Sequence, residues 1–512
     1  MPIARLKNNA FLNAYGLPLI LCLQFAVLVI IQARIYLNYN LQFIDSDQFF
    51  MWAGLKDYAT GLFYEPRYYA QNYNTFFEAL VAVPFYKMGL PAYKALPLAT
   101  HLLFIFPIAS SVIILYRNRH GWQAAMFLAF ILSLNPSYFL LIAQPRGFVT
   151  GLFFCSFFLV SVYKPQQMLW LSLNTVLAVL AYFVNPNSFL FSVPVLVFLF
   201  YKNYNNKTYY FVTAFSILSF FVFDYLFNAF YRAHPDYIKT GLSLKISVTY
   251  FLENINHLDA VFAQLSPFRE GQSIFLILFF FYLLLLLLRQ GRKAFAVASV
   301  SFLLVLLLSF FLDKTRDGST WAYLSYSRMY LAIPFVFAFM LSGTIVRKTE
   351  IPAVFVLAIL LFVGIEWTKM PSHLQKHFDE KNWNALSLIK TKNALEGISV
   401  YAKRCKEKKV NFFLISHSFW MYTALAYGGK AVEDDFPDNM ENYWDKRYWV
   451  REKYENLVLP EFMFLSSDFA IAEKLKGKGA YEVENIDGYG LVMIHNNKMK
   501  LKDFAAIEHN MK

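Results

Sequence analysis

Long apolar runs recur along most of this sequence, and they constrain its fold more than any other feature. A hydrocarbon core about 30 Å thick needs roughly 20 apolar residues per helix, and shorter runs serve inside a bundle. Candidate spans lie at residues 14–36, 95–116, 122–142, 147–163, 167–184, 188–202, 208–230, 273–289, 294–312, 329–346 and 351–368. The pattern predicts an α-helical polytopic membrane protein with about eleven transmembrane helices.

Composition agrees with lipid as the solvent for much of the chain. Of the 512 residues, 58% are hydrophobic and only 16% are charged, and a soluble protein could not hide that much apolar surface. The formal charge of +13 does not indicate a nucleic-acid partner, because no basic stripe carries interleaved aromatic residues. The three cysteines, Cys22, Cys155 and Cys405, have neither metal-ligand nor disulfide spacing.

The distribution of basic residues predicts the orientation. With the N-terminus in the cytoplasm, the cytoplasmic loops contain many Lys and Arg residues and a single acid, Glu350, which is the positive-inside pattern. This assignment requires that residues 76–90, an apolar but short segment, lie in the membrane interface instead of crossing the bilayer. The first apolar run is then a retained anchor and not a cleaved leader.

This topology predicts two domains. Residues 1–368 form a membrane domain with outer loops 37–94, 231–272 and 313–328, and residues 369–512 form a soluble domain on the non-cytoplasmic side. In the tail, expected helices at 381–405, 419–429 (ending on glycine) and 468–476 alternate with strand-like runs such as 409–416, which is typical of a small α/β domain. Because the cytoplasmic connections are short, we expect chemistry or recognition on the outer face.

Three acidic residues are candidates for chemistry in the first outer loop. Asp45 and Asp47 follow the first span directly, and two carboxylates at this spacing can divide the roles of base and orienting group, or bind a cation. The alternative is a solvated turn. Glu78 begins the short segment 76–90, where an acid is costly unless it is paired or functional. Its alternative is a side chain that faces water.

Other polar residues near the outer face suit a sugar or a phosphate. The first loop carries sugar-binding residue types at Arg67, Tyr69, Gln71 and Asn72. Arg146 and Arg328 lie at outer ends of spans; a guanidinium there can grip a lipid phosphate with two hydrogen bonds, although boundary arginines are usually snorkelling anchors. Asn185 and Pro186 mark a further tight turn, most simply a helix stop.

The order of these features resembles the GT-C superfamily of integral-membrane glycosyltransferases, which includes protein mannosyltransferases and lipid A aminoarabinose transferases. The acidic motif of the superfamily, just after the first span, is here Asp45 and Asp47. The other matching positions resemble those of an uncharacterised bacterial branch, and they are Gln71, Tyr73, Glu78, Ala79, Asn135, Pro136, Arg146, Asn185, Ser327, Arg328, Tyr330 and Pro334. The resemblance covers residues 1–345 well and the tail loosely. Thr75 stands where many relatives have glycine, and the histidine-proline motif of the mannosyltransferases is absent.

The resemblance implies an inverting transfer of a hexosyl or pentosyl unit from a polyprenyl-phosphate donor to a glycan, lipid or protein acceptor. Asp45 would be the general base, Asp47 and Glu78 would orient the acceptor, and Arg328 and Arg146 would hold the donor phosphate. The implied substrate-binding residues are Arg67, Tyr69, Gln71, Asn72, Tyr73, Asn185 and Tyr330. A divalent cation (Mg²⁺ or Mn²⁺) is left open, with Asp45 and Asp47 as its ligands. The implied location is a bacterial inner membrane with a periplasmic tail.

Three other functions stay open. A transporter or flippase would have charges near the bilayer midplane and an internal repeat, and the sequence shows neither. An O-antigen ligase or polymerase would rely on a large outer loop between late spans, whereas the best acids here lie in the first loop. A non-catalytic assembly protein would keep its function when Asp45 or Arg328 is replaced.

Overall fold

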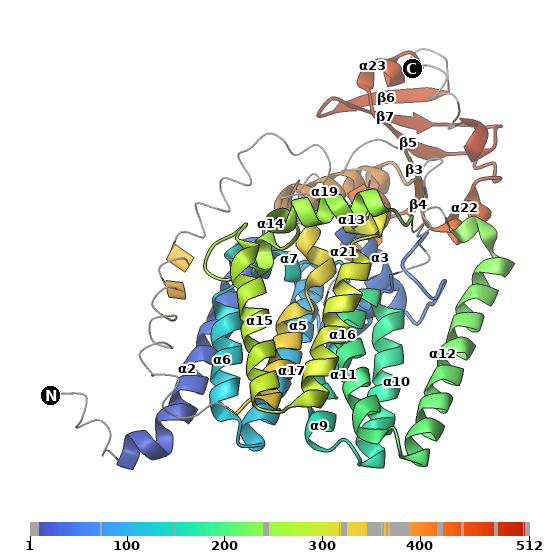
Figure 1. Cartoon of the computed structure of the whole chain (residues 1–512). Helices are drawn as coiled ribbons and strands as arrows, with labels where there is room; N and C mark the ends of the chain where they lie inside the picture. Colours follow the sequence, from blue (N-terminus) through green and yellow to red (C-terminus); the bar gives the residue numbers. More distant parts are fainter. Residues whose placement is uncertain are drawn as a thin grey trace. The chain divides into compact units, whose positions relative to one another are not determined.

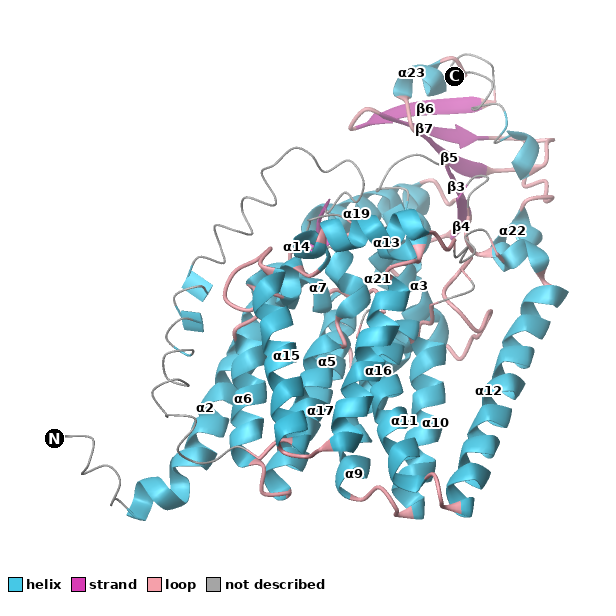
Figure 2. Cartoon of the chain, in the orientation of Figure 1, coloured by secondary structure: helices cyan, strands magenta, loops and turns pink. Residues whose placement is uncertain are grey.

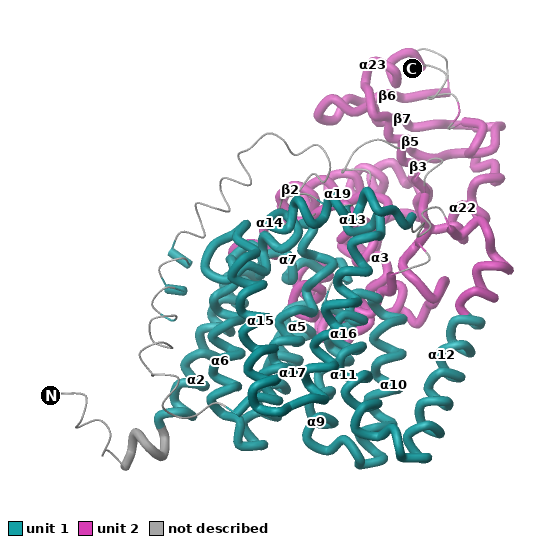
Figure 3. The backbone as a smooth tube through the Cα atoms, in the orientation of Figure 1, with its two compact units in different colours: residues 1–37, 100–226, 243–381 teal, residues 38–99, 227–242, 382–512 magenta. Residues whose placement is uncertain are grey.

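The structure is a computed structural model. It describes residues 10–71, 74–147, 149–238, 245–316, 318, 325–345, 360, 363–364, 367–368, 389–416, 423–441, 445–475, 480–504 and 506. The chain divides into two compact units, which Figure 3 shows in different colours. Unit 1 comprises residues 1–37, 100–226 and 243–381, and unit 2 comprises residues 38–99, 227–242 and 382–512. Unit 2 therefore combines parts of the first two outer segments with the tail.

Unit 1 consists almost entirely of helices. They are α2 (Ala10–Ile35), α6 (Gly121–Leu132), α7 (Pro136–Ile142), α8 (Thr150–Phe154), α9 (Phe158–Tyr163), α10 (Met168–Val184), α11 (Phe189–Asn203), α13 (Val248–Asn256), α14 (Leu258–Val261), α15 (Ser273–Arg289), α16 (Lys293–Ser309) and α17 (Ile333–Gly343), with most of α5 (Ala92–Arg117) and α12 (Lys207–Ala233). The longer ones run alongside one another (Figures 1 and 2). Apolar side chains fill the space between them, such as Phe127, Leu283 and Val336, none more than 1% exposed.

Two expected spans are interrupted. The run 122–142 is divided into α6 and α7, because Pro136 cannot donate a backbone hydrogen bond and disfavours a helical Asn135 before it. Asn135 instead caps α7, its side chain accepting from the backbone N–H of Ser137 at 2.9 Å. The run 147–163 contains a 3₁₀ turn, Cys155–Phe157, between α8 and α9. The apolar pattern of the sequence does not predict such interruptions of a helix.

Three helical segments are long and apolar enough to cross a membrane: Gly16–Asn40, Ala92–Arg117 and Lys207–Ala233. Five shorter apolar helical segments overlap expected spans: Gly121–Leu132, Thr150–Tyr163, Met168–Val184, Ser273–Arg289 and Lys293–Ser309. The last expected span, 351–368, lies mostly outside the described residues. The chain is thus a membrane protein by its apolar helices, whereas the number eleven and the orientation stay predictions.

Unit 2 contains a mixed five-stranded sheet built from the tail. Its order is β4 (Asp438–Glu441), β3 (Phe412–Ile415), β5 (Phe462–Ser466), β7 (Tyr489–Ile494) and β6 (Tyr481–Ile486). Strand β3 pairs in parallel with β4 and β5, while β7 pairs antiparallel with β5 and β6. The tail helices are α19 (Thr391–Glu407), α21 (Gly429–Val432), α22 (Tyr448–Tyr454) and α23 (Phe469–Glu473). The predicted strand at 409–416 is found; β4, which reads as polar, was not predicted.

The helix expected at 419–429 differs from the structure where it is described. A π-helical turn, Ala424–Gly428, leads directly into α21, so the helix continues past both glycines to Val432. Gly428 and Gly429 both have helical backbone angles, so neither ends the helix in a left-handed conformation. Their lack of a side chain instead allows close packing.

The first outer loop and the tail share one hydrophobic core within unit 2. The loop contributes α3 (Ser46–Ala59) and α4 (Phe77–Lys87), with Trp52 and Phe76 each 1% exposed. The tail contributes α19, the π-helical turn and one face of the sheet, with Ile398 and Phe413 each 0% exposed. In addition, β1 (Phe43–Ile44) pairs antiparallel with β2 (Ile389–Lys390). Residues more than 300 positions apart therefore fold together.

Candidate functional site

Asp45 lies where β1 ends and α3 begins. Its carboxylate caps α3 by accepting a 3.0 Å hydrogen bond from the backbone N–H of Gln48, and the residue is 1% exposed. Asp47, in the first turn of α3, is held through its backbone carbonyl, which accepts from the Tyr68 hydroxyl at 2.6 Å. The solvated turn considered for Asp45 is therefore not what the structure contains: this carboxylate is buried and fixed by the helix that follows it.

The other predicted first-loop residues have varied surroundings. Glu78 lies in the first turn of α4 and is 0% exposed, so it does not face water. The Arg67 guanidinium lies over the Phe227 ring, 4.9 Å from its centroid. The backbone carbonyl of Gln71 accepts from the Tyr231 hydroxyl at 3.2 Å. Asn72 and Tyr73 lie outside the described residues.

Glu65 is a buried carboxyl group that the sequence analysis did not single out. It is 1% exposed, and its two oxygens accept from the backbone N–H of Ala70 at 3.2 Å and from the Tyr231 hydroxyl at 3.3 Å. Burial raises its pKa to about 8, against these two hydrogen bonds, which lower it. Ala70 has a φ of 62°, a strained conformation for a residue with a side chain. A strained turn thus holds an acid that keeps its proton near neutral pH.

Tyr69 connects the loop to the far end of α3. Its hydroxyl donates to the Asp57 carboxylate at 2.5 Å. Burial raises the pKa of Asp57, whereas the hydrogen bond from Tyr69 lowers it. Tyr69 is 1% exposed and meets the Phe76 and Trp449 rings edge-on. This tyrosine, predicted to bind substrate, is tied into the packing of unit 2.

Two helix-connecting turns and a 3₁₀ turn come together in unit 1 through asparagine side chains. The Asn185 amide donates to the carbonyl of Gly147, next to Arg146. Two residues later, the Asn187 amide donates to the carbonyl of Arg328 at 3.2 Å. Both arginines are 8% exposed and Asn185 is 5% exposed. The turns that carry these predicted residues are thus connected by hydrogen bonds from two asparagine side chains.

The 3₁₀ turn Tyr326–Tyr330, which carries Arg328, is fixed on several sides. The Ser327 hydroxyl donates to the carbonyl of Val261 at 3.0 Å and accepts from the backbone N–H of Gln264 at 3.2 Å. The Tyr330 hydroxyl lies 3.2 Å from that of Ser309, and its ring meets the Phe262 ring edge-on. Arg328 is therefore presented by a rigid turn.

Gln144, which the sequence analysis did not single out either, is a buried amide in the turn that carries Arg146. It is 1% exposed, and neither its side-chain oxygen nor its nitrogen has a hydrogen-bond partner among the described residues. Burying an amide in this way is costly. Such a group can both donate to and accept from a polar ligand. Its burial alone distinguishes Gln144 from other glutamines, and burial cannot be recognised from a sequence pattern.

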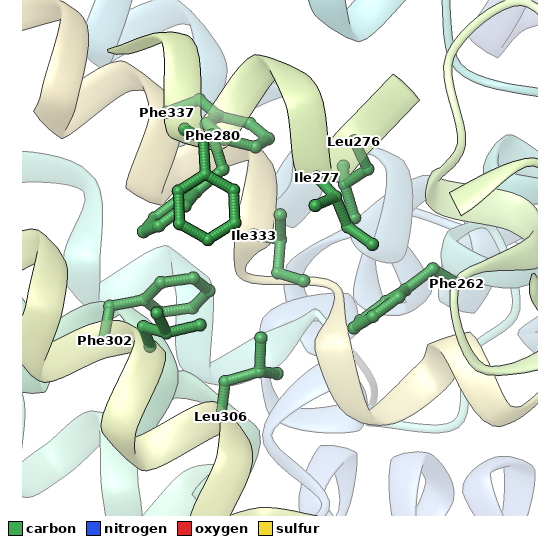
Figure 4. Close-up of a pocket in the computed structure, with 10 residues that line it drawn as sticks. Phe262, Leu276, Ile277, Phe280, Phe302, Leu306, Ile333 and Phe337 are labelled. Carbon is green, nitrogen blue, oxygen red and sulfur yellow. The ribbon is translucent and has the colours of Figure 1, made fainter. Parts of the chain in front are cut away.

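An apolar pocket lies between α15, α16 and α17 of unit 1 (Figure 4). Its cavity volume is about 60 Å³, and all the residues that line it are apolar. The lining includes Phe262, Leu276, Phe280, Phe302, Leu306 and Ile333. Phe262 also contacts Tyr330, so the pocket adjoins the turn that carries Arg328.

The resemblance left open a divalent cation at Asp45 and Asp47. Among the residues that the structure describes, no three or more His, Cys, Asp or Glu side chains are arranged to hold a metal ion. One oxygen of Asp45 already accepts the capping hydrogen bond. A cation held by these two carboxylates alone stays a prediction.

Sequence comparisons identify no relative: no protein-family model matches the chain, and no curated protein matches its sequence. Comparison of structures does. Two crystal structures of ArnT from Cupriavidus metallidurans match with a TM-score of 0.54 and 14% identity, over 92% of this chain and 97% of ArnT. One is the apo state and the other is bound to undecaprenyl phosphate. This protein therefore has the fold of ArnT, which agrees with the GT-C fold expected from the sequence.

Proposed function

We propose that this protein is a GT-C glycosyltransferase that moves a sugar from a polyprenyl-phosphate donor to an acceptor at the non-cytoplasmic face of a bacterial inner membrane. The observation that carries the proposal is that hydrogen bonds from Asn185 and Asn187 connect the turns of Arg146 and Arg328 in unit 1. Two guanidinium groups, each only 8% exposed, lie in turns between apolar helices, and a phosphate on a lipid is the anion that suits them.

Two further observations support a lipid donor. The apolar pocket adjoins the turn of Arg328, so a ligand with an apolar chain and an anionic head matches this part of unit 1. ArnT, whose fold this chain shares, has been crystallised with undecaprenyl phosphate. A polyprenyl phosphate combines both required properties.

In the proposed reaction, an acceptor hydroxyl oxygen attacks the anomeric carbon from the face opposite the phosphate. The new carbon–oxygen bond forms as the bond to the phosphate oxygen breaks, and the acceptor proton passes to the Asp45 carboxylate. Polyprenyl phosphate leaves with the bonding electrons, and Arg328 and Arg146 stabilise its developing negative charge. Asp47 and Glu78 orient the acceptor, and the substrate contacts come from Arg67, Tyr69, Gln71, Asn72, Tyr73, Asn185 and Tyr330.

The test is release of polyprenyl phosphate by the purified full-length protein, given a panel of polyprenyl-phosphate sugars and a membrane extract as the acceptor source. We expect release by the wild type and at least about a hundredfold less by Asp45→Asn, because general-base catalysis contributes roughly 10²–10⁴-fold. Asn keeps the oxygen that caps α3, so the variant should fold.

A matched control is Asp468→Asn, which changes a second helix-capping aspartate, at the start of α23, and should leave release unchanged. Equal release by the wild type and Asp45→Asn would show that the base lies elsewhere. Binding of the donor without any release would favour a transporter.

A further inference from the structure

The tail of this chain holds the segment of the first outer loop that contains Asp45 on both sides of that residue. Before Asp45, the pairing of β1 with β2 fixes Phe43 and Ile44, and the backbone N–H of Thr391 donates to the carbonyl of Gln42 at 2.8 Å. After Asp45, helix α3 packs on the π-helical turn Ala424–Gly428. We propose that the tail is a positioning element for Asp45 and that Gly428 and Tyr427 are positioning residues. This inference rests on the proposed function.

The contact between α3 and the turn is close and specific. The Phe50 ring lies on the Tyr427 ring, with centroids 4.1 Å apart. A methyl group added at Gly428 would lie 3.1 Å from Trp52 Cε3 and 3.3 Å from Phe49 Cδ1. Because interiors are packed as densely as organic crystals, a displacement of this turn displaces the face of α3 that rests on it.

A buried ion pair keeps Tyr427 in place. The Arg447 guanidinium binds Asp445 through two hydrogen bonds, of 3.0 and 2.7 Å, and its charged centre lies 4.8 Å from the centroid of the Tyr427 ring. The Tyr427 hydroxyl accepts from the backbone N–H of Lys446 at 2.7 Å, and the Lys446 ammonium group lies 4.1 Å from the centroid of the Phe50 ring. The tail thus contacts Phe50 on α3 through the Tyr427 ring and the Lys446 ammonium group.

Because Asp45 is the cap of α3, its carboxylate moves with the first turn of that helix. Its hydrogen bond from the N–H of Gln48 fixes one oxygen relative to the helix axis. A base must lie within hydrogen-bonding distance of the proton that it removes, and a misplacement of 1 Å can cost a hundredfold in rate. A displacement of the backbone at Gly428 by a few tenths of an ångström should therefore lower the rate of the chemical step.

Two adjacent glycines provide a matched pair of variants. At Gly428 an added methyl faces α3, whereas at Gly429 it would lie 2.6 Å from the Phe436 ring, which belongs to the tail itself. Both positions have helical backbone angles that alanine accepts. The tighter clash makes Gly429→Ala the more destabilising change, but the three atoms nearest its methyl all belong to Phe436 and not to α3.

The kinetic experiment compares kcat and donor KM for the wild type, Gly428→Ala and Gly429→Ala in the full-length protein. We expect Gly428→Ala to lower kcat by about 10- to 100-fold with donor KM unchanged, and Gly429→Ala to keep kcat per folded molecule within about twofold of the wild type. The double variant Gly428→Ala/Trp52→Phe removes the ring atom that the new methyl meets and should recover part of kcat. Equal losses of kcat in both single variants would overturn the proposal.

Amide hydrogen exchange separates this proposal from the proposed function. Gly428→Ala should raise exchange in the peptide covering residues 43–52, including the Gln48 amide, and Gly429→Ala should raise exchange around Phe436 instead. Unchanged exchange at 43–52 in Gly428→Ala would show that the tail does not hold Asp45, whatever the kinetics. If the wild type releases no polyprenyl phosphate, the proposed function fails, and the exchange data alone decide whether the tail holds this segment.

Discussion

The two groups of candidate residues are held in place by different interactions. In unit 1, Arg146 and Arg328 lie in short turns that asparagine amides connect to each other, so the cluster depends on a few hydrogen bonds. In unit 2, Asp45 and Glu65 lie in a long loop that hydrophobic packing joins to the tail. Hydrogen-bonded turns keep their geometry locally, whereas a loop without its own core needs another segment to complete it. The acids should therefore be more sensitive to distant changes than the arginines.

The largest expected effect comes from a core substitution in the loop. Trp52→Ala removes a side chain that is 1% exposed from the core shared with the tail, and we expect a loss of about 3–5 kcal/mol in the free energy of unfolding of unit 2. The measurement is thermal unfolding combined with limited proteolysis of the tail. Phe127→Ala in unit 1, where Phe127 is 0% exposed, is the control and should leave the tail resistant. A tail that stays resistant in Trp52→Ala would contradict the shared core.

A second prediction concerns the pH dependence of unit 2. Glu65 has a pKa of about 8 in the folded protein, against a reference value of 4.5, so between these pH values the folded state binds more protons than the unfolded state. Its contribution to stability is complete below about pH 4.5 and is lost as the pH rises to about 8, with a slope of at most about 1.4 kcal/mol per unit.

Glu65→Gln cannot ionise and should flatten this slope between pH 5 and 8, as measured by chemical denaturation. Part of the slope should remain, because burial also raises the pKa of Asp57. An unchanged slope would mean that Glu65 is ionised in the folded protein, and the acids of unit 2 would then resemble ordinary surface groups.

The smallest expected effect tests the hydrogen-bonded cluster. Asn185→Ala removes the cap of a 3₁₀ turn and the hydrogen bond to Gly147, and we expect a loss of about 1–2 kcal/mol in stability, since Thr150 still donates to the same carbonyl. Donor KM should rise severalfold with kcat little changed, because the turn of Arg146 becomes less rigid.

Asn174→Ala is the control for this change. Asn174 is 0% exposed and bonds within the bundle to Ser161, so a similar loss of stability should leave donor KM unaltered. If both variants raised KM equally, the bundle as a whole and not the Asn185 turn would set the position of Arg146.

The sequence allowed prediction of those features that depend on local patterns. Apolar runs predicted helices, Asn185 followed by proline predicted a turn, and the apolar run 409–416 predicted the tail strand β3. Glu65 could not be found in this way, because its hydroxyl partner, Tyr231, lies 166 residues later. Nor could the sequence show that β1, only two residues long, pairs with residues 389–390. Local propensity says nothing about a partner so far along the chain.

The pairing of Phe43 with Lys390 also determines when the site can first be complete. During synthesis the loop with Asp45 is made early, and its partner strand only after most of the chain. Domains fold as their segments emerge from the ribosome. The loop with Asp45 therefore stays without its hydrophobic core while the membrane helices are inserted. A nascent chain that lacks residues 389–390 therefore cannot hold Asp45 in its final position, and the proposed transfer activity should begin only after the tail has been made.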